Sequence, residues 1–274
     1  MSGSDVVRAW TGTRFEPVEE PVGATLAADS WLVVDGAVLA FDRHRRRFAD
    51  AVADVGGDAD AALAAADAAA TVVPAGTWSP RLDLTPEGIR LRIRPAPAPS
   101  ATVEVVTAAR DPRTLPLRKG PDLEALAALQ AEERARIGAD VEPILTEKDP
   151  RGDGARRLVA EGTWSALLWW DGDALVVPAA DILRLPSVTA AVILDLARAD
   201  GIEVREARAT PDDLEGREVW LANALRGIRA VTRWHGGPRV ATPERAPAWR
   251  SRLESLRRAP AADRTTDGPI ASRR

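Results

Sequence analysis

Prolines interrupt the chain near its middle and predict two folding units. They stand at positions 95, 97, 99, 112 and 116. Proline lacks the backbone N–H and fixes its own φ, so a segment this rich in proline does not continue a helix or a central strand. We expect a smaller N-terminal α/β domain over residues 1–104, a linker over 105–116, a larger domain over 117–242, and an Arg/Ala/Pro-rich tail over 243–274.

Hydrophobic periodicity predicts helices and strands in both halves, which indicates an α/β (α+β) fold of two domains. Asp35-Gly36 and Asp171-Gly172-Asp173 each separate two apolar runs, and such turn sequences are typical of β-hairpins. The expected helices span residues 42–55, 58–70, 122–137, 187–200 and 249–257. We expect the last of these helices to be exposed and a disordered end to follow it. The expected strands span residues 31–34, 37–41, 89–94, 102–106, 166–170, 174–177, 203–207, 218–221 and 228–234.

Composition excludes several classes of function. A formal net charge of −4 argues against nucleic acid as a partner, because binding to phosphates needs a surplus of basic residues. No apolar run reaches the roughly 20 residues that span a bilayer, and the N-terminus lacks a signal sequence, so we expect a cytoplasmic protein without membrane contact. The chain has no cysteine and only two histidines, His44 and His235, so we expect no metal centre.

Lysine is scarce. Of the 37 basic residues, only Lys119 and Lys148 are lysines. A genome rich in G and C explains the scarcity, although it does not explain where the two lysines stand. If the protein forms a Schiff base, only these two side chains can supply the amine, because arginine stays protonated. Lys148 lies in a charged turn, where a solvated surface lysine is expected.

The segment Leu185-Pro186-Ser187-Val188-Thr189 predicts the start of a helix. Ser187 is a good N-cap, and it leaves the backbone N–H groups of Val188 and Thr189 without helical partners. Such groups at the positive end of a helix dipole can bind an anion, commonly a phosphate. Nearly every helix starts in this way, so the segment by itself also fits an ordinary helix cap.

A series of segments resembles one enzyme family. The segments are His44–Phe48, Glu161-Gly162-Thr163, residues 185–189, Gly201-Ile202-Glu203-Val204, residues 218–225 and residues 227–231. In this order and spacing, over about residues 20–235, the chain resembles the pyridoxal 5′-phosphate (PLP)-dependent class IV aminotransferases of fold type IV. Branched-chain and D-amino-acid aminotransferases and aminodeoxychorismate lyase belong to this family. The resemblance implies a larger domain with a β-barrel-like core, PLP as cofactor, and a homodimer.

The resemblance assigns the reacting groups. Lys119 falls at the Schiff-base lysine, at the end of an expected strand over residues 115–118, and would also carry the proton of the substrate α-carbon. Burial and neighbouring cations such as Arg118 would lower its pKa. Glu161 falls at the acidic partner of the cofactor's pyridine nitrogen. The alternatives are a surface lysine before a helix and a surface glutamate before a glycine turn, although Glu161 leads into the apolar strand expected over residues 166–170.

The resemblance also assigns the phosphate site. Arg47 would clamp the phosphate with its planar guanidinium, although its arginine neighbours on the same helix make a solvated charge run the alternative. Val188 and Thr189 would donate their backbone N–H groups, and Asn223 and Ala224 would form a second contacting turn. The Asn-Ala-Leu sequence from Asn223 resembles aminodeoxychorismate lyase rather than the more usual Thr-Ala.

Two departures from the family pattern concern the cofactor. The chain has no tyrosine, while many members bond the cofactor's phenolic oxygen with one. Asp122 or a water molecule is a candidate substitute. Ala190 stands where an arginine is usual, which removes one cation near the phosphate.

Further residues are candidates for substrate contacts. Arg90, on the arginine face of the strand over residues 89–94, is the closest match to a basic residue that binds a substrate carboxylate. Three tryptophans invite a substrate-stacking role, but we expect Trp164, Trp169 and Trp170 to pack in the core.

Three functions follow from the resemblance. The first is transamination between an amino acid and a keto acid through a lysine Schiff base. The second is 4-amino-4-deoxychorismate lyase, which releases pyruvate and 4-aminobenzoate from the same kind of Schiff base. The third is a PLP-binding relative that has lost catalysis, which the two departures favour and the retention of Lys119 and Glu161 opposes.

Overall fold

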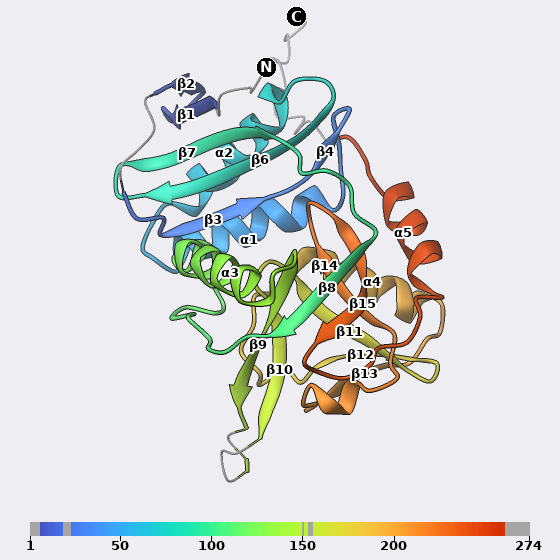
Figure 1. The fold of residues 1–274 in the computed structure, drawn as a ribbon. Helices are drawn as coiled ribbons and strands as arrows, with labels where there is room; N and C mark the ends of the chain where they lie inside the picture. Colours follow the sequence, from blue (N-terminus) through green and yellow to red (C-terminus); the bar gives the residue numbers. More distant parts are fainter. Residues whose placement is uncertain (1–5, 19–22, 150, 153–155, 261–274) are drawn as a thin grey trace, which may run out of the picture.

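The computed structural model describes residues 6–18, 23–149, 151–152 and 156–260, and these residues form two β-sheets flanked by helices (Figure 1). The mixed α/β architecture agrees with the expected fold class. In this part of the chain none of the helices combines the length and the apolar character that crossing a membrane requires.

The first sheet is built from the N-terminal third of the chain. Its strand order is β2-β1-β7-β6-β4-β5, and β3 also pairs with β6. The strands are β1 (Val6–Trp10), β2 (Phe15–Pro17), β3 (Ala27–Ser30), β4 (Val33–Val34), β5 (Ala37–Val38), β6 (Thr77–Thr85) and β7 (Gly88–Pro95). Helices α1 (Phe41–Ala53) and α2 (Ala59–Val72) pack on each other and on this sheet (Figure 1).

Alternation along β7 determines which face of the first sheet is apolar. Ile89, Leu91 and Ile93 are buried in one cluster with apolar residues of α1 and α2, as the period of two predicts. The intervening arginines lie on the opposite face of the sheet, and Arg94 among them lines the cavity described below. The predicted Asp35-Gly36 turn is confirmed, since both residues have positive φ, although the strands that it joins have only two residues each.

The second sheet closes into a barrel. Its order is β10-β9-β8-β15-β14-β11-β12-β13, and an additional pairing of β10 with β11 closes the first six strands on themselves. The strands are β8 (Thr102–Thr107), β9 (Val141–Lys148), β10 (Arg157–Gly162), β11 (Ala166–Asp171), β12 (Ala174–Pro178), β13 (Val204–Ala207), β14 (Val219–Asn223) and β15 (Gly227–His235). The expected β-barrel-like core is therefore confirmed.

The two faces of the barrel strands pack differently. Alternate residues such as Leu167 and Leu221 join one cluster drawn from all six barrel strands. The residues between them, such as Leu168 and Trp220, pack against helices α4 (Val188–Ala199) and α5 (Ala246–Ser255). Helix α3 (Leu123–Ile137) lies on β9, and a short 3₁₀ turn, η1 (Asp212–Leu214), precedes β14.

Several expectations need correction. Strand β8 pairs with β15 and β9, so the chain crosses between the sheets within residues 96–101, ahead of the predicted linker at 105–116. Residues 115–118 form turns rather than a strand. The last helix is not exposed, because its Trp249 and Leu253 are buried against the barrel. The expected disordered end, from residue 261, lies outside the described residues.

Candidate active site

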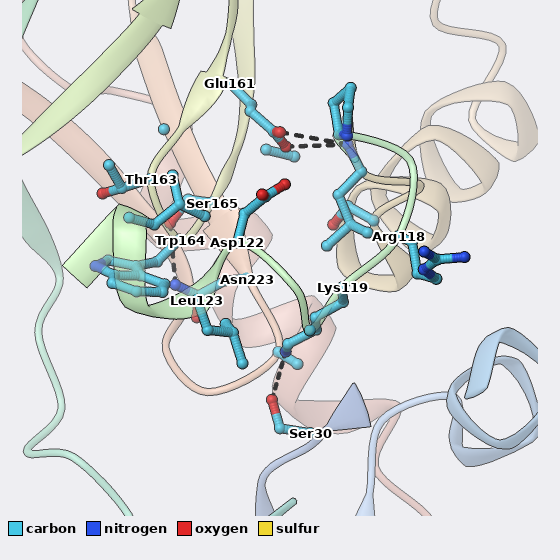
Figure 2. A pocket seen from close by; sticks show the side chains of 18 of the residues that line it. Ser30, Arg118, Lys119, Asp122, Leu123, Glu161, Thr163, Trp164, Ser165 and Asn223 are labelled. Carbon is cyan, nitrogen blue, oxygen red and sulfur yellow. Dashed lines mark hydrogen bonds between the residues drawn. The ribbon is translucent and has the colours of Figure 1, made fainter. Parts of the chain in front are cut away.

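A cavity of about 570 Å³ opens where the two sheets meet (Figure 2). Its walls come from β3, α1, β6 and β7 of the first part of the chain, and from the loop before α3, the β10–β11 turn, the start of α4 and the β14–β15 turn of the second. Of the residues expected at the site, the structure brings seven to this cavity: Arg47, Lys119, Glu161, Val188, Thr189, Asn223 and Ala224.

Strand β3 holds the loop that carries Lys119. The backbone N–H of Ala28 donates to the Lys119 carbonyl at 2.7 Å, and the Lys119 amine donates to Ser30 Oγ at 2.5 Å. Gly120 has φ +134°, and a Cβ there would stand 2.9 Å from the Ala27 backbone. Because only glycine tolerates both the conformation and the close approach, the position after Lys119 requires glycine.

The amine of Lys119 is destabilised in its charged form. Its pKa is lowered to about 8, mainly by burial, with Arg47 and Arg81 adding to the decrease and Asp29 and Asp83 opposing it. We expected Arg118 to act here, but Figure 2 shows its side chain leaving the loop in a different direction from that of Lys119. Lys148 lies exposed at the end of β9, as expected for a solvated lysine.

A buried ionic cluster lies beside Lys119. Asp29 of β3 is fully buried, and it accepts hydrogen bonds from His44 Nδ1 at 2.8 Å and from Arg47 Nε at 2.7 Å and Nη2 at 3.0 Å. Although burial raises the pKa of Asp29, Arg47 and His44 hold it well below its ordinary value. Burial lowers the pKa of His44 against the opposing effect of Asp29. Sequence reasoning missed Asp29, since a single aspartate between Ala28 and Ser30 carries no motif.

The start of α4 has the expected cap. Ser187 Oγ accepts a hydrogen bond from the Ala190 N–H at 3.2 Å, and Arg47 Nη1 reaches the Pro186 carbonyl at 2.8 Å. Arg47 therefore lies at this helix start rather than in a solvated charge run. Thr189 is 1% exposed, and its hydroxyl has no hydrogen-bond partner among the described residues. A buried hydroxyl without a partner, beside free N–H groups, fits a site that an anion completes.

Glu161 forms another wall. It accepts from Arg113 Nη1 at 2.5 Å and from the Leu185 N–H at 3.2 Å. Burial raises the pKa of Glu161 to about 7, against the lowering effect of Arg113. Arg113 also pairs with Asp111 at 2.6 Å. Sequence reasoning did not single out Arg113, because one arginine among many in the proline-rich stretch carries no distinguishing pattern.

Asn223 and Asp122 both shape turns. Asn223 Oδ1 accepts from the N–H groups of the next turn, and its Nδ2 donates to Ser165 Oγ at 3.0 Å. Asp122 accepts from the Thr114 N–H at 3.0 Å and from the Leu115 N–H at 2.9 Å. Although burial raises the pKa of Asp122, these hydrogen bonds lower it below its ordinary value. Asp122 thus fixes the loop before α3 as well as lining the cavity.

The arginine face of the first sheet reaches the cavity through other residues than expected. Arg81 of β6 and Arg94 of β7 line it, whereas Arg90 is not among the lining residues. The register explains this, because Arg81 lies opposite Ser30 of β3, while Arg90 lies opposite Ala9 of β1, on the side of β7 away from β6. Of the three tryptophans, Trp169 and Trp170 are buried as expected. Trp164 is 39% exposed and lines the cavity, because it occupies the β10–β11 turn rather than a strand.

Comparison with known proteins agrees with this architecture. A family model described as amino-transferase class IV matches residues 26–234. The chain belongs to the class IV aminotransferase family, which comprises PLP-dependent enzymes, so the expected resemblance and cofactor are confirmed. No curated protein matches the sequence.

Solved structures share the fold at low identity. A hypothetical aminotransferase from Mycobacterium tuberculosis, in its α-ketoglutarate- and PMP-bound form, is 18% identical with a TM-score of 0.73, covering 92% of this chain and 98% of its own. An aminotransferase from Brucella abortus bound to PLP is 15% identical with a TM-score of 0.71, covering 91% and 98%. A putative 4-amino-4-deoxychorismate lyase from Legionella pneumophila is 16% identical with a TM-score of 0.68, covering 85% and 91%.

Proposed function

We propose that this protein is an aminotransferase that exchanges the amino group of an amino acid with a keto acid at Lys119. One observation carries the proposal. A single cavity combines an amine whose pKa is lowered to about 8, an anion site at the start of α4, and the buried carboxyl of Glu161. These are the three groups that PLP needs for its aldehyde, its phosphate and its ring nitrogen.

The residues present fit the cofactor. The hydroxyl of Thr189, which has no partner in the described part of the chain, the first N–H groups of α4 and the guanidinium of Arg47 would hold the phosphate. Asn223 and Ala224 would form the turn on its other side. Glu161 would face the ring nitrogen. When bound, PLP withdraws electrons from the α-carbon of an attached amine, which makes the proton on that carbon acidic.

The chain's own groups then move protons. With a pKa near 8, the Lys119 amine is partly neutral around neutral pH. Nζ can therefore accept the proton of the substrate α-carbon and pass it to a different atom. Glu161, with a raised pKa and a partner in Arg113, can share a proton with the ring nitrogen. Trp164 and the loop before α3 add apolar side chains to the lining of the cavity.

Covalent labelling tests the proposal. Purified protein is incubated with PLP, reduced with borohydride and digested, and the peptides are examined by mass spectrometry. We expect the label on Lys119, abolished in Lys119→Arg and retained in the matched control Lys148→Arg. Turnover is then followed with amino donors and α-ketoglutarate. A label on Lys148 alone, or no label at all, would contradict the proposal.

Aminodeoxychorismate lyase is the second candidate. The Asn223 turn favours it, since Asn223 bonds Ser165 and its own turn instead of presenting a threonine hydroxyl. Release of pyruvate and 4-aminobenzoate from aminodeoxychorismate, without transfer to a keto acid, would establish the lyase. A catalytically silent relative would show the Lys119 label and neither reaction.

The substrate carboxylate is proposed to bind at the wall formed by β6 and β7. Arg81 is favoured over Arg90 because it lines the cavity and lies opposite Ser30, the hydrogen-bond partner of the Lys119 amine. Asp83 holds the Arg81 Nε at 3.0 Å, which orients the guanidinium. Replacing Arg81 by Gln is expected to raise KM for amino acids, while the Arg90→Gln control leaves it unchanged.

A homodimer in the cytoplasm is the proposed state of the protein. Leu115, Leu117 and Trp164 are large apolar side chains that remain exposed, and Leu115 and Trp164 line the cavity. A second copy that covers them would close the cavity. Sedimentation equilibrium is expected to give twice the chain mass, and a monomer at all concentrations would contradict this.

A further inference from the structure

Asp29 is a buried charge for which the proposed reaction has no direct use. It lies in β3, where all four residues are buried, with Ala28 and Ser30 on either side both bonded to Lys119. A carboxylate in this position is costly unless every oxygen is paired. Both oxygens of Asp29 are satisfied by α1, one by Arg47 alone and the other by His44 and Arg47 together.

These bonds fix the orientation of the Arg47 guanidinium. Arginine has five N–H donors in one plane. Two of them bond Asp29 and one bonds the Pro186 carbonyl. The two remaining donors, one on Nη1 and one on Nη2, suit two oxygens of one phosphate. Without Asp29, the guanidinium would lose the partner that sets its plane.

The same carboxylate acts on the neighbouring amine. The charged and titratable groups around the Lys119 amine are Asp29 on β3, His44 and Arg47 on α1, and Arg81 and Asp83 on β6. The two arginines favour the neutral amine, while the two aspartates favour the charged form. Asp29 is the one of these aspartates that also bonds the phosphate-binding arginine.

We propose that Asp29 is a positioning residue that orients Arg47 for the cofactor phosphate and at the same time sets the charge of the Lys119 amine. The inference rests on the proposed function, because it assigns the phosphate to Arg47. It makes one buried carboxylate control two properties of the site, the affinity for phosphate and the titration of the amine. Replacing it changes both together.

The scarcity of lysine makes the test direct. Protein labelled with [¹³Cε]-lysine gives two side-chain NMR signals, and exposed Lys148 serves as the internal reference. In cofactor-free Asp29→Asn protein we expect the pKa of Lys119 to fall by about one unit. Affinity for pyridoxamine 5′-phosphate, which forms no bond with lysine, is expected to fall roughly tenfold by calorimetry. Affinity for pyridoxamine, which lacks the phosphate, should stay unchanged.

Asp83 provides a matched control. It is also buried and also favours the charged amine, but it bonds Arg81 rather than Arg47. Asp83→Asn is therefore expected to lower the pKa of Lys119 and to leave the affinity for pyridoxamine 5′-phosphate unchanged. If Asp29→Asn folds poorly, Asp29→Glu keeps the negative charge but moves it. The pKa of the Lys119 amine should then stay the same, while the difference in affinity between pyridoxamine 5′-phosphate and pyridoxamine becomes smaller.

Two results would overturn the inference. One is that Asp29→Asn leaves unchanged either the pKa of the Lys119 amine or the difference in affinity between pyridoxamine 5′-phosphate and pyridoxamine. The other is that Asp83→Asn lowers the affinity for pyridoxamine 5′-phosphate as much as Asp29→Asn does. In both cases the unaltered protein still binds PLP at Lys119, so the proposed function survives. Failure of that labelling would instead remove the proposed function, and the inference with it.

Discussion

At the scale of single residues, the site consists of groups held in unfavourable surroundings. The amine of Lys119 is placed where its charged form is poorly solvated, and Glu161 is buried beside a single arginine partner. Thr189 keeps a buried hydroxyl without a partner among the described residues. Each feature lowers the stability of the cofactor-free chain and suits a bound ligand, so function and stability are expected to trade against each other.

Lys119 gives the first prediction. Its pKa is about 8 in the folded chain and near 10.5 when unfolded, so the unfolded state binds more protons between these values and stability rises with pH across that window. Below about pH 8 the folded protein carries the full loss of stability that burial of the charged Lys119 amine causes. Cofactor-free Lys119→Met is therefore expected to be more stable at about pH 7 by about 1–3 kcal/mol, a gap that closes above about pH 10.5.

Urea unfolding of the two proteins over a range of pH measures this gap, with Lys148→Met as the control that changes little. A Lys119→Met protein that is less stable than the unaltered chain below pH 8 would contradict the prediction.

Thr189 gives a second prediction. Thr189→Val replaces an unsatisfied buried hydroxyl by a methyl group of similar size, so the cofactor-free protein is expected to gain about 1 kcal/mol of stability. Its affinity for PLP is expected to fall, because one donor to the phosphate is lost. In contrast, Ser187→Ala removes the N-cap of α4 and should cost about 1 kcal/mol. Equal loss of stability in both variants would argue against an anion site at Thr189.

At the scale of elements, β3 and the loop before α3 act as one unit. The loop has no regular structure, yet its position is fixed by backbone contact with β3 and by the side chain of Asp122. The contact is close enough to exclude any side chain at Gly120. This explains how a turn, rather than a strand, can hold the amine of Lys119 in place.

Gly120→Ala tests this unit. The added methyl would clash with the Ala27 backbone, and an alanine is also strained at this positive φ. We therefore expect a loss of stability of about 3 kcal/mol or more and no PLP label on Lys119. Gly88→Ala is the matched control, because Gly88 has φ +116° with nothing within 4 Å of the added atom. It should cost about 1–2 kcal/mol and leave the labelling intact. Equal effects of the two variants would show that strain at positive φ, and not the close contact with the Ala27 backbone, causes the loss of stability and labelling.

At the scale of the whole molecule, the C-terminal helix joins the two sheets. Trp249 and Leu253 of α5 pack with barrel residues in the same cluster as Leu39, which follows β5 of the first sheet. Beyond α5, Arg258 and Val38 exchange backbone hydrogen bonds, each N–H donating to the other's carbonyl. The two parts of the chain that form the cavity are thus held together from outside it.

Trp249→Ala is expected to lose about 3–5 kcal/mol in chemical denaturation, because it removes a buried aromatic side chain that packs on Trp170 and Trp220. Trp164→Ala is the comparison, and its cost should be well under half as large, since Trp164 is 39% exposed. Comparable losses would mean that α5 contributes little to the assembly of the two sheets.

The sequence by itself determined most elements, because periodicity, capping and turn residues act within a few positions along the chain. Helices over 42–55, 58–70, 122–137 and 187–200 were all predictable to within a few residues, as was the capping of the last of them by Ser187. Two lysines also limited the choice of amine to Lys119 and Lys148. These features depend on neighbours along the chain.

The tertiary structure alone decided which distant residues meet. It paired Asp29 with Arg47 and Arg113 with Glu161, brought Arg81 rather than Arg90 to the cavity, and assigned β8 to the barrel. Strand register and loop closure bring the two ion pairs together across separations of 18 and 48 residues. A pairing between strands far apart along the chain leaves no periodic mark on either one, so the local pattern could not reveal it.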